Sequence, residues 1–301
     1  MLEHLLKERD CLVADGATGT NLMLAGLAPG RLPDLWNSER PDPVAALHRD
    51  FVDAGSDIIL TNTFGASARR LGRLGAEGRC AEINAAGATL ARAAADAADR
   101  PVVVAGSMGP HGEMMPPFGR LTADAAEAGF AAQAAALADG GVHVLWLESF
   151  FILDELAAAA RAAASTGLPI VITLTFDTAG HTMMGDSPAA ALDFVRGLGT
   201  PVVAVGSNCG RDPVSLVDSV RALAEHAQAG EVFVAKANCG MPQIGRKSAS
   251  GGFSYDATPA DMANYAVAAR AAGARIIGGC CGTTPAHVAA MAAALTQVPF
   301  P

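Results

Sequence analysis

The sequence lacks a long hydrophobic run, a surplus of basic residues and a dense pattern of cysteines. No apolar stretch approaches the roughly 20 residues that a membrane-spanning helix needs, and the opening MLEHLLKERD has no signal-peptide core. A formal charge of −9 argues against nucleic acid or an anionic membrane as a partner. Six cysteines in 301 residues do not resemble a secreted disulfide framework. We therefore expect a soluble, cytoplasmic globular protein.

Short apolar runs rich in β-branched residues alternate with longer, alanine-rich segments along the whole chain. The short runs predict eight strands: Cys11–Asp15, Asp57–Asn62, Val102–Ser107, Val142–Glu148, Ile170–Thr175, Val202–Asn208, Val232–Ala237 and Arg275–Gly279. Apolar residues at helical spacing predict helices at Val44–Ala54, Thr122–Asp139, Leu153–Thr166, Pro213–Ala227 and Pro259–Ala272. Asp42, Asp212 and Thr258 each precede a proline, which predicts a capping residue before the first helical position.

Strands that are apolar throughout and alternate with helices indicate a parallel sheet buried on both faces. Eight such units predict a (β/α)₈ barrel of the α/β class, with a doubly wound open sheet as the alternative. No linker or low-complexity tract divides the sequence, so we expect residues 1–301 to form one barrel domain. Residues 111–120 and 241–256 follow strand ends and are candidate lids or docking loops.

Polar and thiol side chains collect where these strands end. Because the carboxyl ends of parallel barrel strands meet at one rim, we expect these residues to lie together. They are Asp15, Asn62, Thr63, Ser107, Glu148, Cys209, Asn238, Cys280 and Cys281. This shared position is stronger evidence for a site than any one of the motifs.

The three cysteines at this rim, Cys209, Cys280 and Cys281, predict a metal site. Zinc favours thiolate ligands, and three protein ligands leave a fourth position open for chemistry. Adjacent strand residues point to opposite faces, so the strand must end or distort between Cys280 and Cys281; the glycines around the pair supply the freedom. Two alternatives stay open: buried small side chains, or a zinc-free, redox-active pair, which would form a strained vicinal disulfide.

The charge on such a site indicates the reaction. Zinc with three thiolates carries about −1, so a thiol that binds as the fourth ligand is deprotonated yet stays nucleophilic. The expected chemistry is alkylation of a thiol, with hydrolysis less favoured. Asp15 and Glu148 would add two carboxylates suited to an ammonium group. The alternative is that Asp15 only begins a turn with Gly16 and that Glu148 caps the following helix. The turn DGATGT, which contains Gly16 and Thr18, is a candidate nest for a substrate carboxylate.

At these residues the chain resembles the homocysteine S-methyltransferase family. The matching motifs are DGATGTNL, AGSDIILTNTFGAS, VAGSMGP, GSNCG and IIGGCCGTTPAHVAAM, spread from residue 15 to about residue 291. The resemblance implies a (β/α)₈ barrel in which Cys209, Cys280 and Cys281 bind Zn²⁺ and the homocysteine sulfur binds the zinc. It implies that Asp15 and Glu148 contact the amino group. The other expected substrate-binding residues are Gly16, Thr18, Asn62, Ser107 and Asn238.

Within the family, TNTFG and ANCGMPQ are similar to the homocysteine-binding module of cobalamin-dependent methionine synthase. This similarity makes Asn238 a candidate zinc ligand that substrate displaces. Cys239 replaces a small residue of that motif. We interpret Cys239 as a buried small side chain, with a spare thiol near the metal as the alternative.

The methyl donor is less well indicated. The branch that uses betaine needs aromatic surfaces, whereas this chain is only 5% aromatic and lacks that branch's C-terminal extension. No DxHxxG-like cobalamin motif is present, so we expect methylcobalamin to be carried by a separate partner protein, as in a divided methionine synthase. A stand-alone enzyme that uses S-methylmethionine is the alternative. A non-catalytic module that presents homocysteine is an alternative of another class. We predict no catalytic residue beyond the zinc-bound substrate thiolate.

Overall fold

The computed structural model describes residues 1–241, 243–244 and 253–297, and in them eight parallel strands form one sheet. Their order around the sheet is β1-β10-β7-β6-β5-β4-β3-β2, and a parallel bridge between Ala14 and Ile58 joins its two ends. The sheet is therefore a closed (β/α)₈ barrel, as the strand count predicts. The strands are β1 (Leu12–Val13), β2 (Ile58–Leu60), β3 (Val103–Met108), β4 (Val144–Phe150), β5 (Ile170–Leu174), β6 (Val202–Cys209), β7 (Phe233–Ala237) and β10 (Ala274–Gly279).

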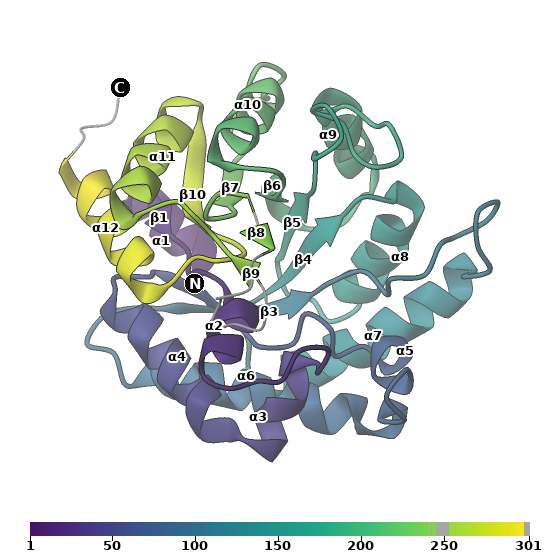
Figure 1. Ribbon diagram of the computed structural model, residues 1–301. Helices are drawn as coiled ribbons and strands as arrows, with labels where there is room; N and C mark the ends of the chain where they lie inside the picture. The colour runs from purple at the N-terminus through teal and green to yellow at the C-terminus, as the bar shows by residue number, and fades with distance from the viewer. Residues whose placement is uncertain (242, 245–252, 298–301) are drawn as a thin grey trace.

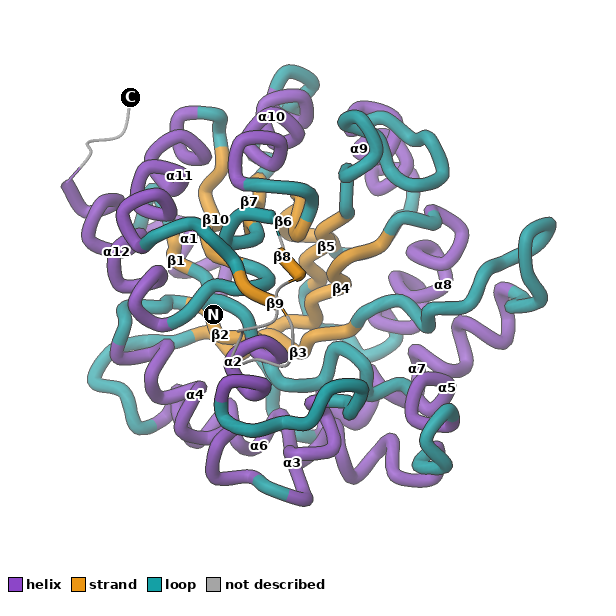
Figure 2. Tube along the Cα trace, viewed as in Figure 1, coloured by secondary structure: helices purple, strands orange, loops and turns teal. Residues whose placement is uncertain are grey.

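Most of the helices surround the barrel strands as an outer ring (Figures 1 and 2). The helices are α1 (Leu2–Glu8), α2 (Thr18–Leu24), α3 (Trp36–Glu39), α4 (Pro41–Asp53), α5 (Ala68–Gly72), α6 (Cys80–Asp96), α7 (Ala123–Asp139), α8 (Leu153–Ala164), α9 (Pro188–Gly197), α10 (Pro213–Ala224), α11 (Pro259–Ala271) and α12 (Pro285–Gln297). Short 3₁₀ turns lie at Pro33–Leu35 and Glu77–Arg79. A hairpin of β8 (Gln243–Ile244) and β9 (Phe253–Ser254) follows β7. None of the described helices combines the length and the apolar character needed to cross a bilayer.

Each predicted strand and helix overlaps an observed one, and two of the three predicted caps are confirmed. Asp212 and Thr258 both form capping boxes with the residue three positions later. The prediction for Asp42 is wrong, because α4 begins at Pro41 with Arg40 at the capping position. Pro41 has the backbone angle that suits the first helical residue, so the helix starts two residues earlier than predicted. Asp42 then lies in the first turn, where a carboxylate favours the positive end of the helix dipole.

Two apolar cores follow from the alternation of side chains along the strands. Inward-facing residues pack inside the barrel with Leu2, Leu5 and Leu6 of α1, which covers the amino-terminal end. Outward-facing residues pack against the surrounding helices. Trp146 belongs to the inner core, and its indole N–H donates to Thr173 Oγ1 at 3.1 Å. The amino-terminal half of the barrel interior is thus filled by apolar side chains.

The first candidate loop, residues 111–120, is anchored at its start by contacts of His111. The backbone N–H of His111 donates to Glu155 at 2.7 Å, and its ring stacks on Phe130 with centroids 3.9 Å apart. These contacts anchor the start of the loop 111–120, while Phe118 near its end is 71% exposed. In the second loop, residues 242 and 245–252 lie outside the described residues.

One buried histidine stands apart from the polar networks. His48 of α4 is 1% exposed, and neither of its ring nitrogens has a hydrogen-bond partner among the described residues. Burial lowers the pKa of His48 from its ordinary 6.5 to about 4. A proton on this ring would be an unpaired charge in the core, so the folded protein keeps the imidazole neutral.

We expect acidification from pH 7 to pH 4 to lower the unfolding free energy of wild type more than that of a His48→Met variant. The decrease on acidification should be about 3 kcal/mol larger in wild type than in His48→Met. The unfolded chain binds a proton at this histidine below about pH 6.5, whereas the folded protein binds it only near pH 4. Protonation of His48 therefore favours the unfolded state between about pH 6.5 and pH 4. Denaturant unfolding at both pH values measures the difference, with exposed His226→Met as the matched control. Equal acid sensitivity in wild type and variant would contradict a neutral, buried His48.

Candidate functional site

A cavity of about 300 Å³ opens at the carboxyl ends of the barrel strands. Its wall combines the turn after β1, the 3₁₀ turn at Pro33–Leu35, the segment after β2 and the ends of β3, β4, β6, β7 and β10. The predicted residues on this wall are Gly16, Thr18, Asn62, Thr63, Ser107, Glu148, Cys209, Cys280 and Cys281. Among the described residues, Asp15, Asn238 and the loop 111–120 do not line it. The barrel therefore brings most, but not all, of the predicted residues to one surface.

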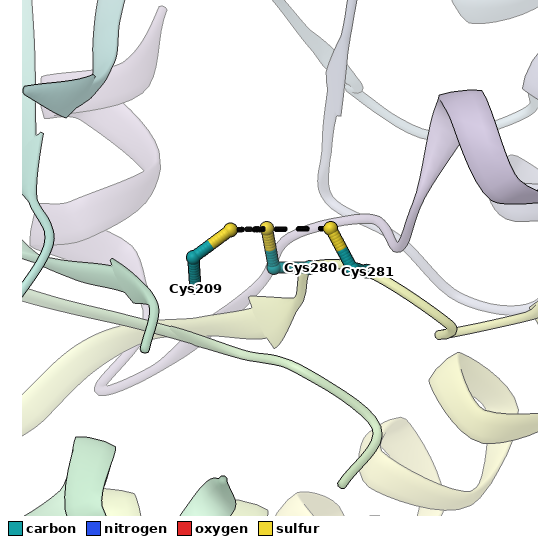
Figure 3. A group of neighbouring side chains, drawn as sticks. All are labelled: Cys209, Cys280 and Cys281. Atoms are coloured by element: carbon teal, nitrogen blue, oxygen red, sulfur yellow. Dashed lines mark hydrogen bonds between the residues drawn. The ribbon is translucent and has the colours of Figure 1, made fainter. Parts of the chain in front are cut away.

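Three sulfurs form the thiol end of this cavity (Figure 3). Cys209 Sγ lies 2.8 Å from Cys280 Sγ and 4.0 Å from Cys281 Sγ, although 71 residues separate the first pair along the chain. The three sulfurs all lie within 4.8 Å of one another. They share this end of the cavity because β6 and β10 both flank β7 and end at the same rim.

Local backbone departures allow the adjacent cysteines to face the same way, as the sequence predicts. The Cys280 N–H still continues the barrel ladder by donating to the Ala237 carbonyl at 2.6 Å. The chain then turns at Gly282, whose φ is +81° and where an added Cβ would lie 2.3 Å from Tyr255 Cγ. Cys209 itself has a φ of 61°, which a non-glycine residue adopts at a cost of about 1–2 kcal/mol. Such strain at a cavity wall is typical of functional positions.

The donor set fits a zinc ion. Sulfurs bound about 2.3 Å from tetrahedral zinc lie about 3.8 Å apart, close to the 4.0 Å between Cys209 and Cys281. The sulfurs of Cys209 and Cys280 lie 2.8 Å apart and would separate by about 1 Å on binding zinc. Hydrogen bonds with Cys280 and Cys281, together with burial, hold the pKa of Cys209 well above its usual value. Three clustered thiolates would repel one another, and a divalent cation is what removes that repulsion.

Asn238 holds the two cysteine-bearing turns together. Its side-chain oxygen accepts from the Cys281 backbone N–H at 3.0 Å, and its amide nitrogen donates to the Gly210 carbonyl at 2.7 Å. The oxygen and the nitrogen of the Asn238 amide thus both form hydrogen bonds with backbone groups at or beside the cysteines. In this structure Asn238 clamps the two turns, and its service as a displaceable zinc ligand stays a prediction.

A second amide clamp, Asn208, was not singled out by the sequence. Its oxygen accepts from the Ser149 N–H at 2.8 Å, and its nitrogen donates to Ser149 Oγ at 2.7 Å and lies 3.8 Å from Cys280 Sγ. Ser149 has a φ of 64°, so this paired contact holds a strained residue at the end of β4. An asparagine directly before a cysteine at a strand end is the signal that could have drawn attention to it.

Glu148 is the carboxylate that faces the cavity. Ser107 Oγ donates to it, and Ser107 is itself held by Thr61 Oγ1, which accepts from its N–H at 3.0 Å. Burial raises the pKa of Glu148 to about 7. The Glu148 carboxyl is therefore poised near neutrality and gains from a cationic ligand.

Asp15 lies behind the cavity wall, fully buried. One of its oxygens accepts from the Leu60 N–H and the other from the Lys236 ammonium, both at 2.7 Å. The structure thus engages both carboxylate oxygens within the protein and leaves Asp15 off the cavity surface. The sequence expectation of a direct contact between Asp15 and the substrate stays a prediction.

Lys236 is the cavity residue that the sequence reasoning missed. It is 2% exposed, lines the cavity and lies 5.4 Å from the centroid of the Trp146 ring. Burial disfavours its charge, but the carboxylates of Asp15 and Glu148 outweigh that effect and raise the pKa of Lys236 above its ordinary value. A lone lysine in the apolar run VFVAKA is the signal, because a buried ammonium needs a partner.

The remaining predicted residues are structural as well as exposed to the cavity. A Cβ on Gly16 would lie 2.6 Å from the Thr283 carbonyl oxygen, so only glycine fits there. The Asn62 amide donates to the Pro33 carbonyl at 2.8 Å and to Asn37 Oδ1 at 2.9 Å, which holds the wall segment before α3 against β2. Outside the cavity, Cys239 is 1% exposed, and its thiol donates to a backbone carbonyl at 3.1 Å.

Comparisons with known proteins agree with this geometry. A profile described as "Homocysteine S-methyltransferase" matches residues 12–295. Methionine synthase from Mycobacterium tuberculosis (strain ATCC 25618 / H37Rv) is 32% identical over 96% of this chain and 25% of its own length. The methionine synthase of Mycobacterium leprae (strain TN) is 32% identical over 95% and 24%. The chain thus spans about a quarter of these curated relatives.

A solved structure matches over nearly its full length. The metallated form of the homocysteine methyltransferase MmuM from Escherichia coli superposes with a TM-score of 0.80 at 25% identity. The match covers 97% of this chain and 99% of that one.

We expect Cys209→Ala to abolish stoichiometric zinc binding, because two thiolates remain where three protein ligands are needed. Metal content after dialysis against a weak chelator measures this, and circular dichroism confirms that the barrel stays folded. Cys80→Ala is the matched control, since Cys80 is a free cysteine outside the cluster. Full zinc retention in Cys209→Ala would rule out the assignment of this ligand.

We expect Asn238→Ala to weaken zinc binding about 10–100-fold without removing it, because residues that orient metal ligands have effects of this size. Competition with a chromogenic chelator measures the affinity. An affinity equal to that of wild type would show that the Cys281 and Gly210 turns need no clamp.

Proposed function

The chain belongs to the homocysteine S-methyltransferase family, and we propose that it transfers a methyl group to the thiol of L-homocysteine, giving methionine. The observation that carries this proposal is the three-sulfur cluster at one end of a cavity that also presents Glu148. The cavity volume of about 300 Å³ suits a small amino acid with space beside it for the transferred group.

We assign the metal to Cys209, Cys280 and Cys281. A zinc ion held by three thiolates supplies a Lewis acid that keeps a thiol deprotonated, a state that a free thiol with a pKa near 8.5 reaches only to a few per cent at pH 7. Asn208 and Asn238 hold the cysteine-bearing strand ends in place. No side chain is required as a general base for the thiol proton.

Glu148 is proposed to accept the substrate ammonium. Its carboxylate lines the cavity, and Ser107 fixes its orientation through a direct hydrogen bond. A cation next to Glu148 favours its ionised form, so binding and ionisation support each other near neutral pH. The substrate is thereby oriented with its thiol toward the cysteines.

For the donor, we propose methylcobalamin carried by a partner protein. The similarity to methionine synthases covers nearly the whole chain but only a quarter of those proteins, which supports a role as one module of a larger system. Exposed apolar side chains on the loops that follow β3, β5 and β7 and in the first turn of α10 offer a surface for such a partner. They are Phe118, Met183, Met184, Val214 and Met241.

A stand-alone enzyme with a small donor such as S-methylmethionine is the second candidate. It is favoured by the match to MmuM, a homocysteine methyltransferase whose solved chain is covered to 99%. In that case the space beside the substrate would hold the donor itself.

We expect zinc-loaded protein to form methionine from homocysteine with methylcobalamin bound to a carrier protein, and not with S-methylmethionine or betaine. Methionine formation with the three donors in parallel is the measurement, and Cys209→Ala should be inactive with each. Turnover with S-methylmethionine alone would replace the partner-dependent assignment by the stand-alone one. Binding of homocysteine without turnover from any donor would indicate a module that only presents the substrate.

A further inference from the structure

The cavity has a second charged wall that no step of the proposed reaction uses. Asp34, in the 3₁₀ turn Pro33–Leu35, and Arg70, in α5, both line the cavity, and neither is among the residues that the sequence predicts. Around the closed barrel, three strands separate β2 from β6 in either direction. The segment after β2, which carries Arg70, therefore lies across the cavity from Cys209 at the end of β6.

The Asp34 carboxylate is held in place but retains an acceptor for a ligand. It is 3% exposed, and one of its oxygens accepts from the Gly65 N–H at 2.7 Å. The other oxygen makes no hydrogen bond with another residue of the described chain. Burial raises the pKa of Asp34 to about 6, so a further N–H donor would stabilise its ionised form.

Arg70 also has unused hydrogen-bonding capacity. A guanidinium has five N–H donors, and within the described residues the Arg70 side chain donates to the Pro110 carbonyl at 3.2 Å. Its guanidinium lies over the Phe64 ring, 5.0 Å from the centroid. These two contacts position the side chain and leave its other donors for a ligand in the cavity.

The two charges lie close together without touching. If Gly65 carried a Cβ, Asp34 Oδ2 would lie 2.9 Å from it and Arg70 Nε 3.5 Å from it. Both groups thus border the space that the missing side chain leaves, yet no ion pair within 4.0 Å joins them in the part of the chain that is described. A ligand group placed between them can donate to Asp34 and accept from Arg70 at once.

The apolar surroundings of this space favour a neutral group. Leu32 Cδ2 would lie 3.4 Å from the same Cβ, and the Phe64 ring lies beneath the guanidinium. Further charges are costly to bury in such surroundings, whereas a neutral group that both donates and accepts satisfies Asp34 and Arg70 together. A primary carboxamide is such a group, since its nitrogen has two donors and its oxygen two lone pairs.

The donor that the proposed function requires carries groups of this kind. The corrin ring of methylcobalamin bears acetamides on the same face as its methyl group, and this face must turn toward the sulfurs for methyl transfer. We propose that Asp34 and Arg70 together bind one of these acetamides. Asp34 accepts from the amide nitrogen, and Arg70 donates to the amide oxygen. This inference rests on the proposed function and gives its donor a recognition element across the cavity from Cys209.

Ultrafiltration of zinc-loaded protein without homocysteine tests the assignment, because corrins are coloured and their binding then needs no turnover. The first probe is methylcobalamin. The second is its derivative in which an acetamide of the methyl-bearing face is hydrolysed to a carboxylate, each such acetamide being taken in turn. The matched control is the derivative in which a propionamide of the opposite face is hydrolysed.

The decisive quantity is the preference, defined as the affinity for methylcobalamin divided by the affinity for the acetamide-derived carboxylate. Asp34 repels a carboxylate and Arg70 attracts it. Asp34→Asn should therefore lower the preference about 10-fold relative to wild type, and Arg70→Gln should raise it about 10-fold, the size of one charged contact. Neither variant should change the preference measured with the propionamide-derived carboxylate. A merely structural role of the two side chains would not move the preference in opposite directions.

The variants are matched by controls on the surface. Asp34→Asn keeps an oxygen that can accept from the Gly65 N–H, so the wall should stay intact. Asp42→Asn and Arg49→Gln change exposed residues of α4 and should leave every affinity at its wild-type value. Zinc content and homocysteine affinity should equal those of wild type in all four variants.

The outcomes separate this inference from the function on which it rests. Any result other than opposite shifts of the preference in Asp34→Asn and Arg70→Gln overturns the acetamide assignment and leaves methyl transfer standing. Absence of methylcobalamin binding to wild type overturns the assignment as well. Opposite shifts, together with no methionine from homocysteine and carrier-bound methylcobalamin, would support the corrin site and overturn the proposed function.

Discussion

Closure of a parallel eight-stranded ladder is the constraint on which the rest of this molecule depends. The bridge between Ala14 and Ile58 joins the two edges of the sheet, so each strand has a neighbour on both sides. Because all the strands run the same way, their carboxyl ends share one rim. Cysteines 71 residues apart meet there because β6 and β10 are separated by a single strand. The opposite end is covered by α1, whose leucines pack on the inner core.

Low polarity inside the barrel gives the few charges at the rim their importance. Asp15 and Lys236 are both almost fully buried and satisfy each other, whereas Glu148 faces the cavity with a pKa raised to about 7 by burial. In such surroundings an uncompensated charge is expensive, so a ligand of opposite charge is bound more strongly than it would be in water. The site therefore selects ligands by charge as well as by their sulfur.

Backbone strain and side-chain amides complete the arrangement. Cys209 and Ser149 both have positive φ angles, and Asn208 links the end of β4 to Cys280. Asn238 similarly ties the turn after Cys209 to Cys281. These clamps cost conformational freedom but hold three sulfurs close together. Preorganisation of this kind is what lets a metal site keep an open position.

The sequence by itself determined the barrel, the helix caps at Asp212 and Thr258, and the group of three cysteines. These depend on hydrophobic periodicity, local hydrogen bonds and the preference of zinc for sulfur, all of which can be read along the chain. The early start of α4 was missed because Pro41 and Pro43 offer competing first positions, and their contexts decide between them. Only the tertiary structure decided that Asp15 lies behind Lys236 while Glu148 faces the cavity. Asp15 and Lys236 are 221 residues apart in the sequence, and a buried charge is paired with whichever group the fold brings beside it.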